Sequence, residues 1–137
     1  MKLLIIEENN QKCEKLVEYF DLYFSVNSAN NGLQGLINAI EWRPDILLIN
    51  HYSSFVNSLE LCHQLRQKLK TTIIIIVGDN FTQEKTIEYF QVGADDVYEY
   101  PIIYPALLCK IKVLLKYCTI RNSGYEEVKI FSESVMN

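Results

Sequence analysis

The stretch DILLIN (45–50) decides the fold, because four apolar residues follow one another before the run ends at Asn50. A strand with one face in water alternates apolar and polar residues, whereas a strand covered on both faces is apolar throughout. KLLII (2–6) and TIIIIV (72–77) have the same continuous pattern. These three runs predict the central strands of a parallel sheet that is buried on both faces.

Helical patterns separate these runs from one another and from two further expected strands, YFSVNSA (23–29) and DVYEY (96–100). Apolar residues recur there at the spacing of one helix face. The residues expected to face the sheet are Cys13, Leu16, Val17 and Phe20; Leu33, Leu36, Ile37 and Ile40; Leu59, Cys62, Leu65 and Leu69; Ile87 and Phe90; and Leu107, Leu108, Ile111, Leu114 and Leu115. This alternation predicts a single (βα)5 α/β domain of the flavodoxin-like, doubly wound class, with strand order 2-1-3-4-5 and helices on both faces.

Residues at the expected helix ends agree with this interpretation. Asn31 and Asn57 precede two of the helical stretches and suit N-caps, and Pro105 suits the first turn of the last helix. Gly93 suits the position just after the fourth helix, where a left-handed backbone conformation is common.

The last residues differ from the rest. The expected domain covers residues 1–118, and residues 119–137 are expected to form a linker and tail. TIRNSG (119–124) has the composition of a linker, and YEEVKIFSESV (125–135) alternates like a half-exposed strand. That strand has no obvious partner in a five-stranded sheet, so we expect it to belong to a part that follows.

Composition limits the classes of function. The 137 residues carry a formal net charge of −4, which provides no basic surface for nucleic acid. No apolar run is long enough to span a membrane, and MKLLIIEENN (1–10) has too few apolar residues for a secretion signal. We therefore expect a cytoplasmic protein without a membrane segment, which would reach DNA only through a separate domain.

The expected topology also predicts where a site would lie. In a doubly wound sheet, ligands bind at the carboxyl ends of the strands, near the point between strands 1 and 3 where the strand order reverses. The residues at those ends are Glu7 and Glu8, Asn50, Val77 and Tyr100.

Several stretches, in this order and spacing, resemble the receiver domain of response regulators (CheY-like) from residue 1 to about residue 117. LLIIEENN (3–10) is similar to the opening strand with its acidic pair, and RPDILLIN (43–50) to the strand that ends in the phosphoacceptor Asp. NSLELCHQLR (57–66) and GADDVYEYP (93–101) resemble the helix that follows and the turn into strand 5. The resemblance implies a pocket in which acidic residues hold Mg²⁺, an Asp accepts phosphate, and a hydroxyl and a Lys bind the phosphoryl oxygens.

Matched residue by residue, the pocket departs from this pattern at nearly every part. Glu7 and Glu8 keep the acidic pair with one more methylene each. The replaced positions are the phosphoacceptor (Asn50), the hydroxyl (Val77), the Lys (Tyr100) and the aromatic switch residue of strand 5 (Val97). An amide cannot attack phosphorus, and two glutamates alone hold Mg²⁺ at most weakly. We therefore expect a degenerate receiver, or pseudo-receiver, with no catalytic residue, no enzymatic activity and no cofactor.

Ordinary structural roles are expected for the pocket residues. One of Glu7 and Glu8 would cap the helix that follows, and Asn50 would hydrogen-bond Tyr100, Glu8 or backbone donors. His51 is expected to be exposed or locally satisfied. The resemblance further implies that the peptide bond before Pro101 is cis.

The fourth helix, fifth strand and fifth helix are expected to share one charged surface, which in the winged-helix branch of response regulators (the OmpR/PhoB type) forms a symmetric dimer. The residues expected on it are Lys85, Glu88, Tyr89, Asp95, Asp96, Tyr98, Lys110 and Lys112. Asp95 or Asp96 would pair with Lys110 or Lys112 across a homodimer. The alternative is an ordinary solvated surface, where ion pairs contribute about 0–1 kcal/mol each.

The expected function is therefore a receiver that acts in signal transduction and transcription regulation without phosphorylation, through dimerisation or binding of another regulatory protein. The tail resembles the linker and first strand that precede a winged-helix DNA-binding domain. Two alternatives stay open. The domain could accept phosphate at another residue, such as Ser53, Ser54 or Asp79, or its pocket could bind a small molecule.

Overall fold

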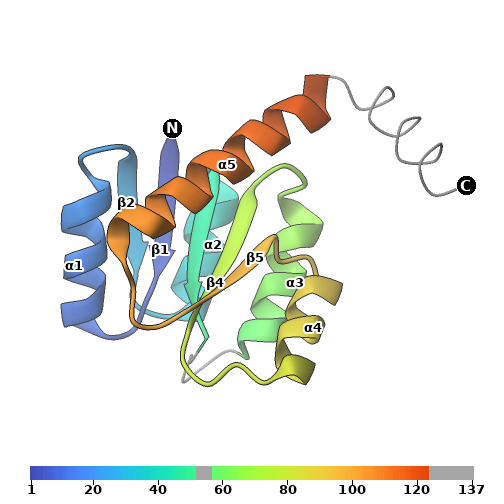
Figure 1. Cartoon of the computed structure of the whole chain (residues 1–137), viewed down its shortest axis with the longest axis horizontal. Coiled ribbons are helices and arrows are strands. Elements are labelled where there is room, and N and C mark those ends of the chain that lie inside the picture. Colours follow the sequence, from blue (N-terminus) through green and yellow to red (C-terminus); the bar gives the residue numbers. More distant parts are fainter. Residues whose placement is uncertain (52–56, 124–137) are drawn as a thin grey trace, which may run out of the picture.

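The computed structural model describes residues 1–51 and 57–123, which form one parallel five-stranded sheet with helices on both faces (Figure 1). In chain order the elements are β1 (Lys2–Ile6), α1 (Asn10–Phe20), β2 (Ser25–Ala29), α2 (Gly32–Trp42), β3 (Ile46–Asn50), α3 (Ser58–Lys68), β4 (Ile73–Gly78), α4 (Gln83–Gln91), β5 (Asp96–Glu99) and α5 (Tyr104–Ser123). The strand order is β2-β1-β3-β4-β5. This confirms the predicted topology.

The continuous apolar strands are explained by two separate cores, one on each face of the sheet. Along β3, Leu47 and Ile49 pack in the core under α2, α3 and α4, while Ile46 and Leu48 pack in the core under α1 and α5. Every residue of β3 and β4 is buried. Burying one such side chain stabilises the fold by about 1.5–3 kcal/mol, so these strands anchor both layers.

Helix α2 turns a different side to the sheet from the predicted one. Leu33, Ile37 and Ile40 are exposed, and the buried residues are the small ones, including Gly35 and Ala39. A Cβ on Gly35 would lie 2.5 Å from Cδ1 of Ile6, a separation that no real side chain tolerates. Small residues therefore let α2 approach the sheet closely, and the larger apolar residues are turned outward.

The prediction for α4 was wrong in the same way. Ile87 and Phe90 are exposed, and Tyr89 is the one buried residue of this helix, at 1% exposure. A Tyr is buried when its hydroxyl finds a partner inside, and here His51 supplies one.

The helix ends largely follow the sequence signals. Asn31 and Asn57 cap α2 and α3 as predicted, accepting hydrogen bonds from backbone N–H groups at 2.8 Å. Gly93 adopts a positive φ of 115° after α4. The cap of α1, however, is Asn9, which accepts from the N–H of Lys12, and neither Glu7 nor Glu8 takes that position.

Helix α5 is longer than predicted. It continues to Ser123, so residues 119–123, which were expected to open the linker, are helical. The physical reason is that no Gly or Pro interrupts the chain between Pro105 and Gly124. The domain boundary at residue 118 stays a prediction. The predicted strand at 125–135 lies outside the described residues. Across the described ranges, no helix is both long and apolar enough to cross a membrane.

One side chain joins four elements at the end of the sheet opposite the predicted site. The guanidinium of Arg66 donates to the carbonyls of Leu69 and Thr72 at 3.0 and 2.7 Å and to that of Gly93 at 2.9 Å. It also pairs with Asp95 at 2.7 Å. Arg66 thereby ties the end of α3 to the starts of β4 and β5 and to Gly93, the second residue after α4.

We expect Arg66→Ala to lower the free energy of unfolding by about 3 kcal/mol, because it removes the cation paired with Asp95 and the donor of several carbonyls. Urea unfolding measures the loss. Lys85→Ala is the control, since it removes an exposed ion pair with Glu88 and should change stability by less than about 0.5 kcal/mol. Equal losses for the two variants would contradict a central role for Arg66.

Candidate functional site

The predicted site residues do meet at the carboxyl edge of the sheet. Glu7 follows β1, Asn50 ends the neighbouring β3, and Tyr100 follows β5. Asn50 is in register with Val77 of β4. Parallel strands end at the same edge, so residues far apart in the chain become neighbours there.

The centre of the site is a hydrogen bond between an amide and a carboxylate. The Nδ2 of Asn50 donates to Oε2 of Glu7 and, at 3.2 Å, to the hydroxyl of Tyr100. The other oxygen of Glu7 accepts from the backbone N–H of Asn9 at 3.0 Å. Glu7 is only 5% exposed and Asn50 only 9%. The predicted hydrogen bond between Asn50 and Tyr100 is confirmed. The carboxylate that accepts from Asn50 in these contacts belongs to Glu7, whereas the prediction named Glu8.

Electrostatics explain why an amide suits this position. Burial raises the pKa of Glu7, and the hydrogen bonds from Asn9 and Asn50 and the charge of Lys12 oppose that rise. A second carboxylate at position 50 would lie against Glu7 and require a cation between them. The Asn50 amide instead provides N–H donors and no charge.

The phenol of Tyr100 adds a neutral group to the site. Its pKa is raised to about 12, chiefly by burial and then by the charge of Glu7. The hydroxyl therefore keeps its proton. The nearby cation comes from another element, since the Nζ of Lys12 on α1 lies 4.6 Å from the centre of the Tyr100 ring.

Val77 and Val97 occupy the two switch positions of a receiver, those of the hydroxyl and of the aromatic residue, and we call them the switch pair; they lie in different cores. Val77 is buried in the core under α1 and α5, where Tyr98 and Tyr100 pack against it. Val97 packs against the core under α2, α3 and α4. Neither valine has a polar group, so the pair has no hydrogen bond with which to link the pocket to the surface. The peptide bond between Tyr100 and Pro101 is cis, as the resemblance implies.

The residues of this pocket do not form the Mg²⁺ site that the receiver resemblance implies. Glu7 is occupied by two N–H donors, and Asn50 turns its amide nitrogen to the carboxylate. Among the described residues, no group of three His, Cys, Asp or Glu side chains could hold a metal ion. Weak binding by Glu7 and Glu8 stays a prediction.

The structure places the expected dimer residues on more than one surface. Asp96 and Lys110 pair with each other within the chain at 2.9 Å, and Lys85 pairs with Glu88 at 3.6 Å. Asp95 instead binds Arg66 of α3, and its carboxylate also accepts from the N–H of Ile74, so it points away from α5.

Two more of the expected dimer residues, Lys112 and Tyr89, lie away from the surface that α4, β5 and α5 share. Lys112 lies over the ring of Tyr23 at 5.6 Å, on the α1 side of α5, and Tyr89 is buried. We call the remaining surface the α4–β5–α5 face, and it carries Lys85, Glu88, Asp96, Tyr98 and Lys110.

Sequence relatives and solved structures define the class of this domain. No protein-family model matches the chain. The response regulator ArlR of Staphylococcus epidermidis is 30% identical over 118 residues, which are 85% of this chain and 53% of that protein. ArlR of Staphylococcus aureus is 28% identical over an equal length. The chain thus spans about half the length of the curated relatives it matches.

Among solved structures, a CheY-like receiver domain protein from Methanospirillum hungatei has a TM-score of 0.83 at 18% identity, covering 86% of this chain and 95% of that one. A two-component response regulator from Clostridium difficile has a TM-score of 0.80 at 21% identity, covering 85% and 96%. At these identities the likeness shows the fold. Together with the relatives, it shows that the chain belongs to the response-regulator receiver (CheY-like) family, the domain class of two-component signalling.

Sequence reasoning missed two contributors to the site. Asn9 was overlooked as a cap, although an Asn just before a helical stretch is a standard signal. Lys12 gave no signal that could have found it, because its position over Tyr100 depends on how α1 packs beside the end of β5.

The pH dependence of stability tests the burial of Glu7. Because folding raises its pKa, the folded protein binds a proton more tightly than the unfolded chain just above pH 4.5. The free energy of unfolding that Glu7 contributes is therefore lost as the pH rises above 4.5. Glu7→Gln has no carboxyl to titrate, so its stability should not show this loss. We expect the unfolding free energy of the wild type to fall relative to that of Glu7→Gln between about pH 4 and about pH 7. A difference that is constant with pH would contradict this account.

Proposed function

We propose that this receiver works without aspartyl phosphorylation, as a module that pairs with a second copy through its α4–β5–α5 face. The hydrogen bond from Asn50 to Glu7 carries the proposal. The phosphoacceptor position holds an amide, and the acidic residue that would bind metal is engaged by that amide. No anionic oxygen is left at position 50 to attack a phosphodonor.

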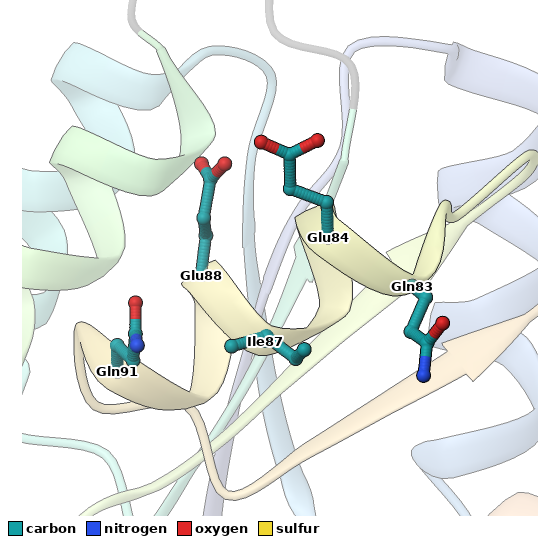
Figure 2. A pocket seen from close by; sticks show the side chains of 5 residues that line it. All are labelled: Gln83, Glu84, Ile87, Glu88 and Gln91. Atoms are coloured by element: carbon teal, nitrogen blue, oxygen red, sulfur yellow. The ribbon is translucent and has the colours of Figure 1, made fainter.

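Charge on the α4–β5–α5 face supports pairing of two copies. Residues 104–123 contain no acidic residue, and α5 exposes Lys110 and Lys116. The α4 half of the face carries Glu88 and, next to it, Glu84, with Lys85 paired to Glu88, so this half has one more acidic than basic side chain. Figure 2 shows these two carboxylates projecting from the same side of α4, with Ile87 between them along the helix. A two-fold axis would place the acidic half of one copy against the basic half of the other.

Exposed apolar side chains on the same face would supply the driving force for pairing. Ile87 and Phe90 project from α4, and Val113 from α5. Val113 lines an apolar hollow between α5 and Asp96. Burying apolar area is the main favourable term in protein association, and the flanking charges would set the orientation.

The output of the protein would lie in a separate domain. The curated relatives are about twice as long as the matched region, and their name describes response regulators. We propose that the natural protein belongs to the OmpR/PhoB type, that pairing of receivers brings two winged-helix domains together on DNA, and that transcription is regulated in this way. The receiver itself has no basic surface for that contact, given its net charge of −4.

Phosphorylation from a small donor tests the pocket directly. With acetyl phosphate and Mg²⁺, we expect intact mass spectrometry to show no phosphate adduct on the wild type. Asn50→Asp alone should react poorly because Val77 and Tyr100 remain, whereas the triple change Asn50→Asp, Val77→Thr, Tyr100→Lys should react measurably. A wild-type adduct that disappears in Asn50→Ala would refute the proposal, and one that persists would favour another acceptor such as Asp79.

Sedimentation equilibrium without a phosphodonor tests pairing. We expect a dimer that Val113→Glu breaks, because a charge there would face the acidic half of the other copy. Val113 is 66% exposed, so the folded monomer should lose little stability.

Leu33→Glu is the matched control, since Leu33 is 60% exposed on α2, far from the α4–β5–α5 face. Lys110→Glu should also weaken pairing, but it breaks the bond to Asp96 within the chain as well. A wild type that stays monomeric at all concentrations, or equal effects of Val113→Glu and Leu33→Glu, would refute pairing through this face.

A further inference from the structure

His51 is held rigidly at the edge of the pocket. It directly follows Asn50, and its backbone N–H donates to the carbonyl of Val77 at 2.8 Å, which continues the contact between β3 and β4. A Cβ on Gly78 would lie 2.5 Å from the Cβ of His51, so only a glycine there permits this approach. The backbone around Asn50 therefore fixes the direction of the His51 side chain.

That side chain reaches the one buried residue of α4. The Nδ1 of His51 lies 2.6 Å from the hydroxyl of Tyr89. The two rings meet edge to face, with centroids 5.5 Å apart and planes at 69°. Phe81, from the loop before α4, packs on both, at 4.6 Å from the His51 ring and 6.1 Å from the Tyr89 ring. Three rings from three segments thus form one cluster between the pocket and α4.

We propose that His51 and Tyr89 are positioning residues that replace the missing switch pair and transmit the fixed conformation at Asn50 to α4. The valines at the switch positions lie in different cores and have no polar group. The His51–Tyr89 bond does connect the two regions, because one partner adjoins Asn50 and the other is buried in α4. The α4 half of the face is thereby held in a single position.

The protonation of His51 is consistent with a stable hydrogen bond between His51 and Tyr89. A neutral imidazole can accept the Tyr89 proton at Nδ1, whereas an imidazolium has donors on both nitrogens. Burial and the charge of Lys85 lower the pKa of His51, which favours the neutral form. The Tyr89 hydroxyl is thus supplied with an acceptor inside the protein.

Hydrogen exchange of the full chain tests the link, with the amides of α4 compared with those of α1. Tyr89→Phe removes only the hydroxyl, and we expect exchange of residues 83–91 to rise about fivefold, with residues 10–20 unchanged. The matched control is Tyr98→Phe, which removes a hydroxyl on the same face that accepts from the N–H of Ile103 at 3.1 Å. That control should leave α4 unchanged.

A double variant separates coupling from general loosening. If both residues act through one bond, His51→Phe combined with Tyr89→Phe should raise α4 exchange no further than the larger single effect. Additive effects, a uniform rise over all helices, or equal results for Tyr89→Phe and Tyr98→Phe would overturn the proposal.

The readout on pairing rests on the proposed function, and the exchange readout does not. In a Val113→Glu background the chain is expected to be monomeric, and the response of α4 there decides the link alone. If the wild type pairs, Tyr89→Phe should also raise its dimer dissociation constant severalfold, and an unchanged constant would overturn the role in positioning the face. If the wild type never pairs, the proposed function fails while the exchange result still decides the link.

Discussion

The structure of the site depends on one buried hydrogen bond, from the Asn50 amide to the Glu7 carboxylate. A buried carboxylate needs donors or a cation, and in a pocket of several carboxylates a metal ion must supply the charge. Here an amide supplies N–H donors without adding charge. The rest of the pocket is consistent with this arrangement, because Tyr100 stays a neutral phenol and Lys12 contributes its charge from α1.

A pocket satisfied by its own side chains changes what the domain can do. A ligand shifts a conformational equilibrium only when it binds one state better than the other. On the proposed function, phosphate does not serve as that ligand, because the Asn50 amide has no anionic oxygen to accept it. On the same proposal, the domain would have one dominant state set by packing, and its useful property would be the surface that this state presents.

The sequence predicted the sheet and the place of the site because both depend on patterns along the strands. Continuous apolar runs indicated which strands are central, and strand order then brought Glu7, Asn50 and Tyr100 together. Helix faces were harder. The periodicity of α2 marked an apolar stripe, but the side facing the sheet was decided by the close approach of Gly35 to Ile6. Contacts across the fold, such as Arg66 with Asp95, left no pattern along the chain.

On the proposed link from His51 to Tyr89, helix α4 would present a defined surface although valines stand at the switch positions. Its last turn is held from inside by Tyr89, and Gly93, the second residue after its end, is held by Arg66 through its carbonyl. A helix fixed at both places has little freedom left to lose when a partner binds. Association of preordered surfaces is favoured because less conformational entropy is lost at the interface. The same two contacts that remove mobility from α4 would therefore strengthen pairing through the face that α4 carries.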